Sequence, residues 1–250
     1  PIFDAEVAPR LEPIVKRGQK DPYAFATALV IFADTIGNAK DLAHKYIPHV
    51  LPLFLKYVSD VKDHDLRRGC AYGIVACVRE MGTHYQPHVE ATLKGLMAGA
   101  VAVYDDPDDE ERCEGANDNV LSALAEVVTL FGLEQRGLPE DVVREVVWRC
   151  VDSLPRIFDE DEARATHHRL AQWLTMDPTL VFGQQRERIG RVATVFAELL
   201  QQAEEYHILA EEDEKVIRGV WTAVRESMTE AQYAELWNSV DAEVRGYLHK

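Results

Sequence analysis

Two segments of the chain carry the same helical pattern. Residues 70–77 and 115–124 are both rich in small side chains, have apolar positions three and four residues apart, and are each followed by a turn and a second amphipathic helix. Fainter copies of this hairpin lie on either side. A helical hairpin repeated along a chain predicts a stacked solenoid, and a solenoid usually presents a surface that holds another protein.

Helical periodicity covers nearly the whole sequence, and no segment shows the sustained alternation of a strand. After a first helix that ends at Gly18, corresponding points recur roughly every 45–52 residues, near the period of HEAT and armadillo arrays. We therefore expect an all-α fold, with residues 1–250 forming one α-solenoid of HEAT-like hairpins in a right-handed superhelical arc. The expected hairpins span residues 22–59, 65–104, 110–153, 161–203 and 211–248.

Turn residues support these divisions. Gly37, Gly82, Gly132 and Asp177 fall where helices are expected to stop. Pro52 lies in the second helix of the first hairpin, where a proline predicts a kink or a late helix start.

Small residues inside the helices indicate tight packing. Four glycines that weaken helix propensity are expected where stacked helices approach closely: Gly69, Gly73, Gly95 and Gly99. Four cysteines lack Cys-x-x-Cys spacing and are predicted to be buried apolar residues in a reducing compartment: Cys70, Cys77, Cys113 and Cys150.

The charge of the chain restricts its partners. With 27 Lys and Arg against 43 Asp and Glu, the net charge is −16, which repels nucleic acid and anionic membranes and attracts histones, ribosomal proteins and other basic partners. The alternative is that the acidity only keeps the protein soluble. Acidic runs precede several hairpins, where carboxylates also favour helix N-termini. The run that starts at Asp105 is longer than capping needs and predicts a mobile acidic loop.

No pattern predicts catalysis. The sequence has no glycine-rich phosphate loop. His84 and His88 are four residues apart, but no third metal ligand lies at a suitable spacing. His167 and His168 are adjacent, point to different faces and are expected at the exposed surface. We therefore expect no enzyme activity, no metal and no cofactor.

Several motifs carry a family resemblance through their order and spacing: Arg68–Gly82, Tyr85–Pro87, Asn117–Ala123, Ser153–Pro155, Asp159–Ala163, Asp177–Pro178 and Gly183. Together they resemble the C-terminal third of an importin-β-family karyopherin, of the branch that imports ribosomal proteins and histones. The resemblance is strongest from Asp60 to Leu200, and residues beyond Ala203 match only as generic closing helices. The chain opens on Pro1 inside a helical pattern, which suggests a fragment of a longer receptor.

The resemblance implies a nuclear transport receptor that shuttles between cytoplasm and nucleus. Such receptors bind cargo in the cytoplasm, contact Phe-Gly nucleoporins in the pore and release cargo when Ran-GTP binds. The main Ran site of the family lies in N-terminal repeats that this sequence lacks, so weak Ran binding is expected. The competing interpretations are a HEAT scaffold of another pathway, such as a regulatory subunit that positions a phosphatase, and an α-helical enzyme.

The candidate cargo-binding residues lie on second helices, which line the concave face of such arrays. In the helix near residue 148, the apolar stripe is expected to be buried, which leaves Glu145, Trp148 and Asp152 on the other side. The indole of Trp148 packs well on a lysine stem, and Asp152 meets its ammonium group. An acidic strip extends these residues: Glu198, Gln202, Asn238 and Asp241. The alternative is that Trp148 packs against a neighbouring repeat.

Nucleoporin contact would use shallow apolar grooves between first helices on the convex face. Four aromatic residues lie on first helices, and burial in the core is the alternative for each: Phe25, Phe32, Tyr72 and Phe131.

Overall fold

The computed structural model describes residues 2–60, 62–100, 103 and 106–249. Over these residues the chain is 84% helical, contains no strand and packs its helices against one another as an all-α helical solenoid. This confirms the predicted fold class. The chain forms two compact units, Pro1–Val127 and Val128–Lys250. The predicted end of the second hairpin, at residue 104, and Asp105 of the acidic run lie outside the described residues.

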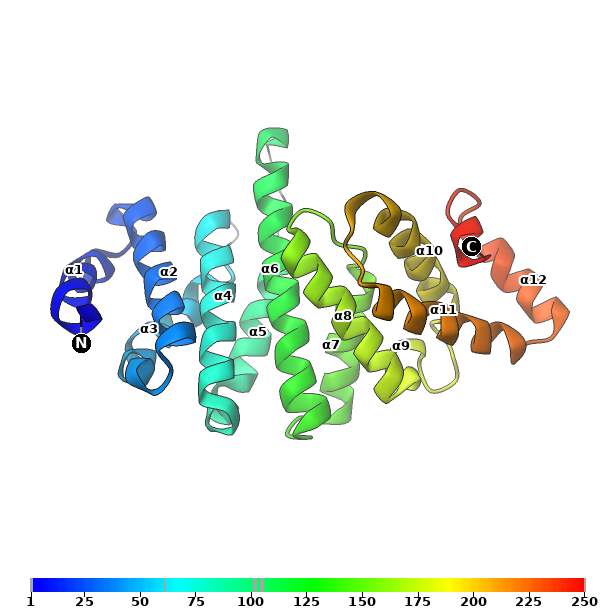
Figure 1. The fold of residues 1–250 in the computed structure, drawn as a ribbon, viewed down its shortest axis with the longest axis horizontal. Helices are drawn as coiled ribbons and strands as arrows, with labels where there is room; N and C mark the ends of the chain where they lie inside the picture. The colour runs from blue at the N-terminus through cyan, green and yellow to red at the C-terminus, as the bar shows by residue number, and fades with distance from the viewer. Residues whose placement is uncertain (1, 61, 101–102, 104–105, 250) are drawn as a thin grey trace. The chain divides into compact units, whose positions relative to one another are not determined.

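The first unit is built from helical hairpins. Its longer helices α2, α4 and α6 lie side by side, with α3 and α5 forming a layer behind them (Figure 1). The elements of this unit are the π-helix η1 Phe3–Val7, α1 Ala8–Arg17, α2 Pro22–Ala39, α3 Ile47–Tyr57, α4 His64–Met81, α5 Val89–Gly99, α6 Glu110–Val127, and the 3-10 helices η2 Gly18–Lys20, η3 Lys40–Tyr46, η4 Gly82–His88 and η5 Pro107–Asp109.

Capping residues set where these helices begin and end. The carboxylates of Asp21 and Asp63 accept hydrogen bonds from the backbone N–H groups of Ala24 and Leu66, at 3.2 and 3.0 Å, which satisfies donors that a helix start leaves open. Gly82 follows α4 with a φ of 51°, a conformation that glycine adopts without strain. The predicted helix start after Asp21 and the predicted stop at Gly82 are confirmed.

The predicted close-approach points are also confirmed. Each of these four glycines lies against a neighbouring helix or its end: Gly69, Gly73, Gly95 and Gly99. A Cβ atom at Gly69 would lie 2.7 Å from Cγ2 of Val30, and one at Gly73 would lie 2.5 Å from the ring of Phe54. Only a residue without a side chain lets α4 approach α2 and α3 this closely.

A buried arginine joins three helices of the first unit. Arg67 on α4 is fully buried, and its guanidinium donates to the carbonyl oxygens of Gly99 at 3.0 Å and Cys113 at 2.9 Å. Backbone carbonyls thereby compensate a charge that burial would otherwise penalise heavily. All four cysteines of the chain are buried, as predicted, and none of them forms a disulfide.

The second unit contains the C-terminal helices. Its elements are the π-helix η6 Val128–Glu134, α7 Glu140–Asp152, α8 Glu160–Met176, α9 Pro178–Phe182, α10 Ile189–Tyr206, α11 Glu211–Glu226, α12 Glu230–Ser239 and the 3-10 helix η7 Arg245–His249. Helix α7 packs against α9 and α10, α8 against α11, and α10 against η7. The short helix α9 is not among the predicted elements.

One predicted helix stop is wrong. Gly132 lies inside η6, which continues to Glu134, and its missing side chain serves packing instead: a Cβ there would lie 2.7 Å from Cγ2 of Val143. The stop predicted at Gly37-Asn38 is confirmed to within one residue, since α2 ends at Ala39.

Two further expectations need correction. The predicted late start of the helix around Pro52 is wrong, because α3 begins at Ile47 and contains this proline. The predicted mobile acidic loop is wrong from Asp106 onward. Asp106 accepts a hydrogen bond from the N–H of Asp108 at 3.0 Å and caps η5, which leads directly into α6.

Candidate functional site

The predicted cargo residues begin on α7, whose apolar face is buried as expected except at Val142, which is half-buried. The buried residues are Val143, Val146, Val147, Cys150, Val151 and, just after the helix, Leu154. Glu145 and Asp152 are exposed and Trp148 is half-buried. The helical period therefore places these three side chains away from the core stripe.

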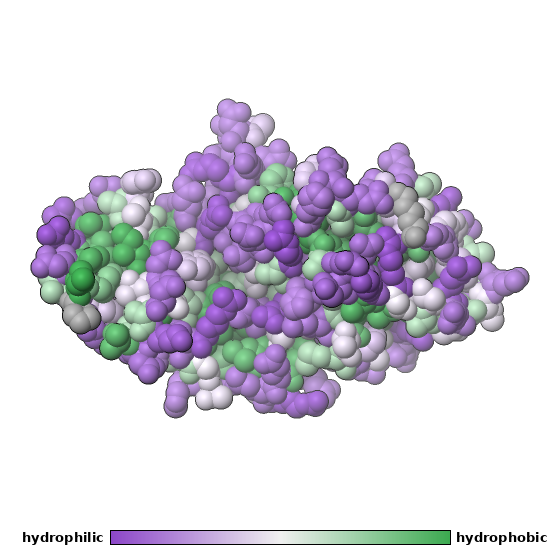
Figure 2. All heavy atoms as spheres, in the orientation of Figure 1, coloured by the Kyte–Doolittle hydropathy of each residue, from purple (hydrophilic) through white to green (hydrophobic). Residues whose placement is uncertain are grey.

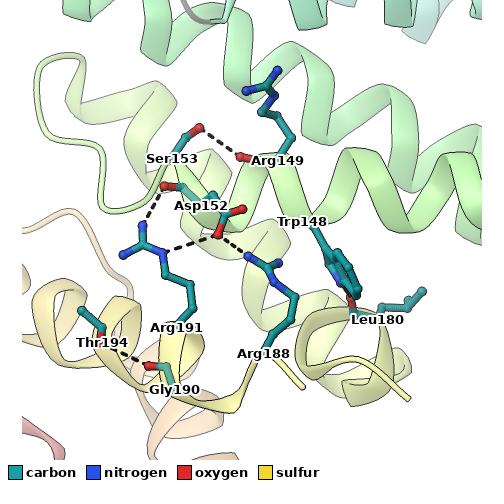
Figure 3. Close-up of polar contacts among 9 residues, drawn as sticks. All are labelled: Trp148, Arg149, Asp152, Ser153, Leu180, Arg188, Gly190, Arg191 and Thr194. Atoms are coloured by element: carbon teal, nitrogen blue, oxygen red, sulfur yellow. Dashed lines mark hydrogen bonds and ion pairs between the residues drawn. The ribbon is translucent and has the colours of Figure 1, made fainter. Parts of the chain in front are cut away.

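Helix α9 holds one edge of Trp148. The indole Nε1–H donates to the carbonyl oxygen of Leu180 at 2.8 Å (Figure 3). The chain then turns at Gly183, where φ is 84°, and at Arg186, where φ is 59°. The N–H of Arg188 closes this turn on the carbonyl oxygen of Phe182 at 3.1 Å.

This turn places a cation over the indole. The guanidinium carbon of Arg188 lies 4.8 Å from the ring centroid of Trp148, within the range of a cation–π interaction. The same guanidinium forms an ion pair with the carboxylate of Asp152 (Figure 3). Arg191, one turn along α10, adds a 3.4 Å ion pair to that carboxylate and donates to the carbonyl oxygen of Asp152 at 2.7 Å.

We call Trp148, Asp152 and the Leu180 carbonyl the cation seat. An indole and a carboxylate four residues apart hold one cationic side chain. Trp148 contacts Leu180 and Arg188, which belong to the segment after α8, as expected for the alternative in which it packs against a neighbouring repeat. The cation is not a partner's lysine, however, but Arg188 of the same chain. Its side chain is only 11% exposed, and one guanidinium nitrogen, Nη1, is buried with no hydrogen-bond partner among the described residues.

Two other residues of the predicted strip interact electrostatically with the surroundings of the seat: Glu198 with Arg191, and Asp241 with Glu198. Burial raises the pKa of the Glu198 carboxyl on α10, while Arg191 lowers it and Asp241 raises it. Arg191 therefore interacts with both Asp152 and Glu198, and Asp241 lies within electrostatic range of Glu198. Within the described residues, no hydrogen bond or ion pair joins this group to the remaining three predicted residues: Glu145, Gln202 and Asn238.

The sequence analysis did not predict that Arg188 and Arg191 would belong to the site. Arg186, Arg188 and Arg191 are three arginines within six residues of an acidic chain, directly before an apolar helical pattern. That local excess of positive charge was the available signal. Nothing in the spacing indicated that Arg188 would reach Trp148, because the approach depends on the turn between α9 and α10.

A buried histidine lies elsewhere in this unit, and its predicted exposure is wrong. His167 is fully buried; its Nδ1 lies 2.9 Å from the carbonyl oxygen of Ile208, and its Nε2 accepts the N–H of Arg156 at 3.2 Å. Burial lowers the pKa of this imidazole to about 4, so it is neutral at pH 7. His168 is exposed as predicted, and its Nδ1 lies 2.9 Å from a carboxylate oxygen of the buried Asp213.

The first unit offers an apolar surface. Figure 2 shows hydrophobic residues gathered over α1 and α2. The exposed large apolar side chains of this unit include Ile2 before η1, Tyr23 at the start of α2 and Leu42 in η3, with exposed fractions of 76%, 83% and 72%. A cavity of about 550 Å³ lies beside α2 and the N-terminal end of α4, with Val30 and Ile31 in its wall. Three carboxylates and two cations line its other side: Asp63, Asp65, Asp109, Lys62 and Arg112.

The four aromatic residues considered for nucleoporin contact differ in their exposure to solvent. Phe25, Phe32 and Phe131 are buried in the core. Tyr72 is 37% exposed, and its hydroxyl donates to the carboxylate of Asp34 at 2.8 Å. An apolar contact surface on the first unit would therefore use the residues around Tyr23 and Ile31 rather than these phenylalanines.

Within the part of the chain that the structure describes, no three His, Cys, Asp or Glu residues are grouped so that they could hold a metal ion. Among the same residues, no helix combines the length and apolar character needed to cross a bilayer.

No family model matches the sequence, and no curated protein matches it significantly.

Proposed function

We propose that this chain is a non-catalytic protein-binding segment that recognises basic protein partners. The observation that carries this proposal is the cation seat: the side of α7 away from the core presents an indole and a carboxylate spaced to hold a guanidinium group. A net charge of −16 adds long-range attraction for positively charged partners. Recognition of this kind needs no cofactor.

The specific form that we propose is a nuclear transport receptor of the importin-β class. The motif order between Asp60 and Leu200 supports it, and the repeated helical hairpins suit it. In this proposal the cargo is a ribosomal protein, a histone or a similar basic protein. Phe-Gly nucleoporins contact the apolar surface of the first unit, Ran-GTP acts mainly through repeats outside this sequence, and the receptor shuttles between cytoplasm and nucleus.

A capture experiment from cell extract tests the proposal, using the full-length parent and this chain, each with and without Ran locked in its GTP form. The expected result is that the parent captures basic nuclear proteins and that Ran-GTP releases them. Retention of the same proteins by this chain would place cargo contacts in these helices. Failure of both to capture basic proteins would contradict the proposal.

The second candidate is a helical scaffold with a permanent folded partner, such as a phosphatase subunit. The apolar surface over α1 and α2 favours it, because large exposed apolar patches mark stable protein interfaces. The same capture experiment separates the two. A scaffold would hold one enzyme regardless of Ran-GTP, whereas a receptor would exchange basic cargo.

A further inference from the structure

We propose that Arg188 is an internal occupant of the cation seat, and that an arginine side chain of a basic partner replaces it when the partner binds. The proposal rests on the proposed recognition of basic partners and names the site and the exchange through which it occurs. Arg188 would then act as a built-in competitor that sets the affinity and selectivity of the seat.

The seat has the features of a guanidinium-binding site. Its aromatic face lies 4.8 Å from the guanidinium carbon, and its carboxylate forms the ion pair. The Trp148 side chain is held in place by α9, because its Nε1–H is already bonded to the Leu180 carbonyl at 2.8 Å. A planar guanidinium stacks on an indole and meets a carboxylate in a defined geometry, which an ammonium group does less well. Arginine is therefore the preferred incoming residue.

Arg188 fills the seat imperfectly. Nη1 of Arg188 is buried without a hydrogen-bond partner among the described residues, and a buried donor without a partner is unfavourable. Release of this side chain to solvent would let water satisfy that nitrogen. Arg188 is therefore held less favourably in the seat than a guanidinium group whose nitrogens are all hydrogen-bonded would be.

Arg191 makes the exchange electrostatically feasible. It contacts the Asp152 carboxylate at 3.4 Å and the Asp152 carbonyl at 2.7 Å, so the carboxylate keeps a positive neighbour while Arg188 is displaced. The Asp152 side chain is 48% exposed, which lets a partner reach it. Replacement of one guanidinium by another leaves the charge of the cluster unchanged.

Only a side chain has to move. The backbone N–H of Arg188 is bonded to Phe182 O at 3.1 Å, and its carbonyl accepts the N–H of Val192 at 2.9 Å. These bonds hold the start of α10 in place whichever way the side chain points. Rotation about the side-chain bonds of Arg188 therefore empties the seat without unfolding the turn.

The test is a binding measurement on the whole chain with a fluorescein-labelled peptide in which arginine alternates with glycine. Arg188→Ala is expected to bind this peptide about tenfold more tightly than wild type, because the internal competitor is gone. The matched control is Arg149→Ala, which removes the same charge from the same region. Arg149 is exposed and points away from the seat (Figure 3), so its loss should change affinity by less than about twofold.

Two further variants and a second peptide separate exchange from a general charge effect. Arg188→Lys keeps a cation in the seat but holds it less well than a guanidinium does, so it should bind the peptide more tightly than wild type and less tightly than Arg188→Ala. Trp148→Leu in the Arg188→Ala background should remove the gain. A peptide with citrulline in place of arginine has no charge and should not compete. Equal affinities for Arg188→Ala and Arg149→Ala would overturn the exchange and leave Arg188 as a structural clamp.

A measurement on the wild-type chain keeps the test valid if Arg188→Ala fails to fold. The NMR signals of the Trp148 Nε1–H and the Arg188 Nε–H should both move when the arginine peptide binds. Peptide binding with both signals unmoved would overturn the exchange while leaving recognition of basic partners intact. No binding of the peptide by wild type or any variant would overturn both proposals.

Discussion

The buried His167 leads to a prediction about pH at the residue scale. Its pKa falls from 6.5 to about 4 in the folded protein. Between these values the unfolded chain binds more protons, so folded-state stability is present above pH 6.5 and is lost as pH falls toward 4. This group alone should lower the free energy of unfolding by about 2 kcal/mol between about pH 7.5 and pH 5.

Denaturant unfolding at both pH values measures this loss. His167→Gln cannot be protonated in this range, so the variant should lose about 2 kcal/mol less than wild type over the same interval. His84→Gln, a change at an exposed histidine, is the matched control and should show the wild-type loss. The same pH dependence in His167→Gln and wild type would show that this imidazole does not carry the effect.

Other single residues differ in how far their roles follow from sequence. The small residues of α4 were predictable, because a glycine in a helix interior needs a packing reason, and Gly73 lies against Phe54. The spacing of Trp148 and Asp152 on one helix also indicated that the two could share a cation. The identity of that cation was not predictable, because Arg188 is 36 residues from Asp152 along the chain and arrives through a turn that no local pattern specifies.

At the scale of helices and turns, long periodic segments were the predictable ones. The hairpins expected from residues 65 and 161 begin within one residue of these positions, with α4 at His64 and α8 at Glu160. Helix α9 was missed because five residues are too short to show a helical period. The stop at Gly132 was wrong because a glycine there can serve close packing against Val143 as well as end a helix. Local sequence does not distinguish these two uses.

Packing between helices gives a prediction with an internal control. Gly73→Ala should destabilise the first unit by about 1–3 kcal/mol, because the new Cβ would meet the buried Phe54 ring. Gly115→Ala, also within a helix, has no atom within 4 Å of its added Cβ and should be neutral or stabilising by up to about 1 kcal/mol. Thermal unfolding followed by circular dichroism measures both. Equal effects would show that helix propensity, and not the approach of α4 to α3, governs this position.

At the scale of the whole molecule, charge rather than any single contact governs how a basic partner arrives. The chain carries 43 acidic against 27 basic residues, and several of its arginines are already paired with carboxylates, as Arg188 and Arg191 are with Asp152. The remaining field is negative, extends beyond the seat and is screened by salt. The seat selects a side chain at short range, whereas the net charge accelerates the encounter.

This division predicts that salt mainly changes the association rate constant of a basic partner. It also predicts that loss of the Asp152 carboxylate mainly changes the dissociation rate constant. From about 50 mM to about 500 mM salt, the association rate of a basic protein should fall about tenfold or more, because screening removes the long-range attraction. Asp152→Asn should mainly raise the dissociation rate, because it removes a short-range contact. Glu145→Gln, which removes the same charge from an exposed position on α7 without a partner among the described residues, should leave dissociation nearly unchanged. Stopped-flow measurements resolve both rate constants. An association rate constant that is independent of salt would mean that the net charge has no part in recognition.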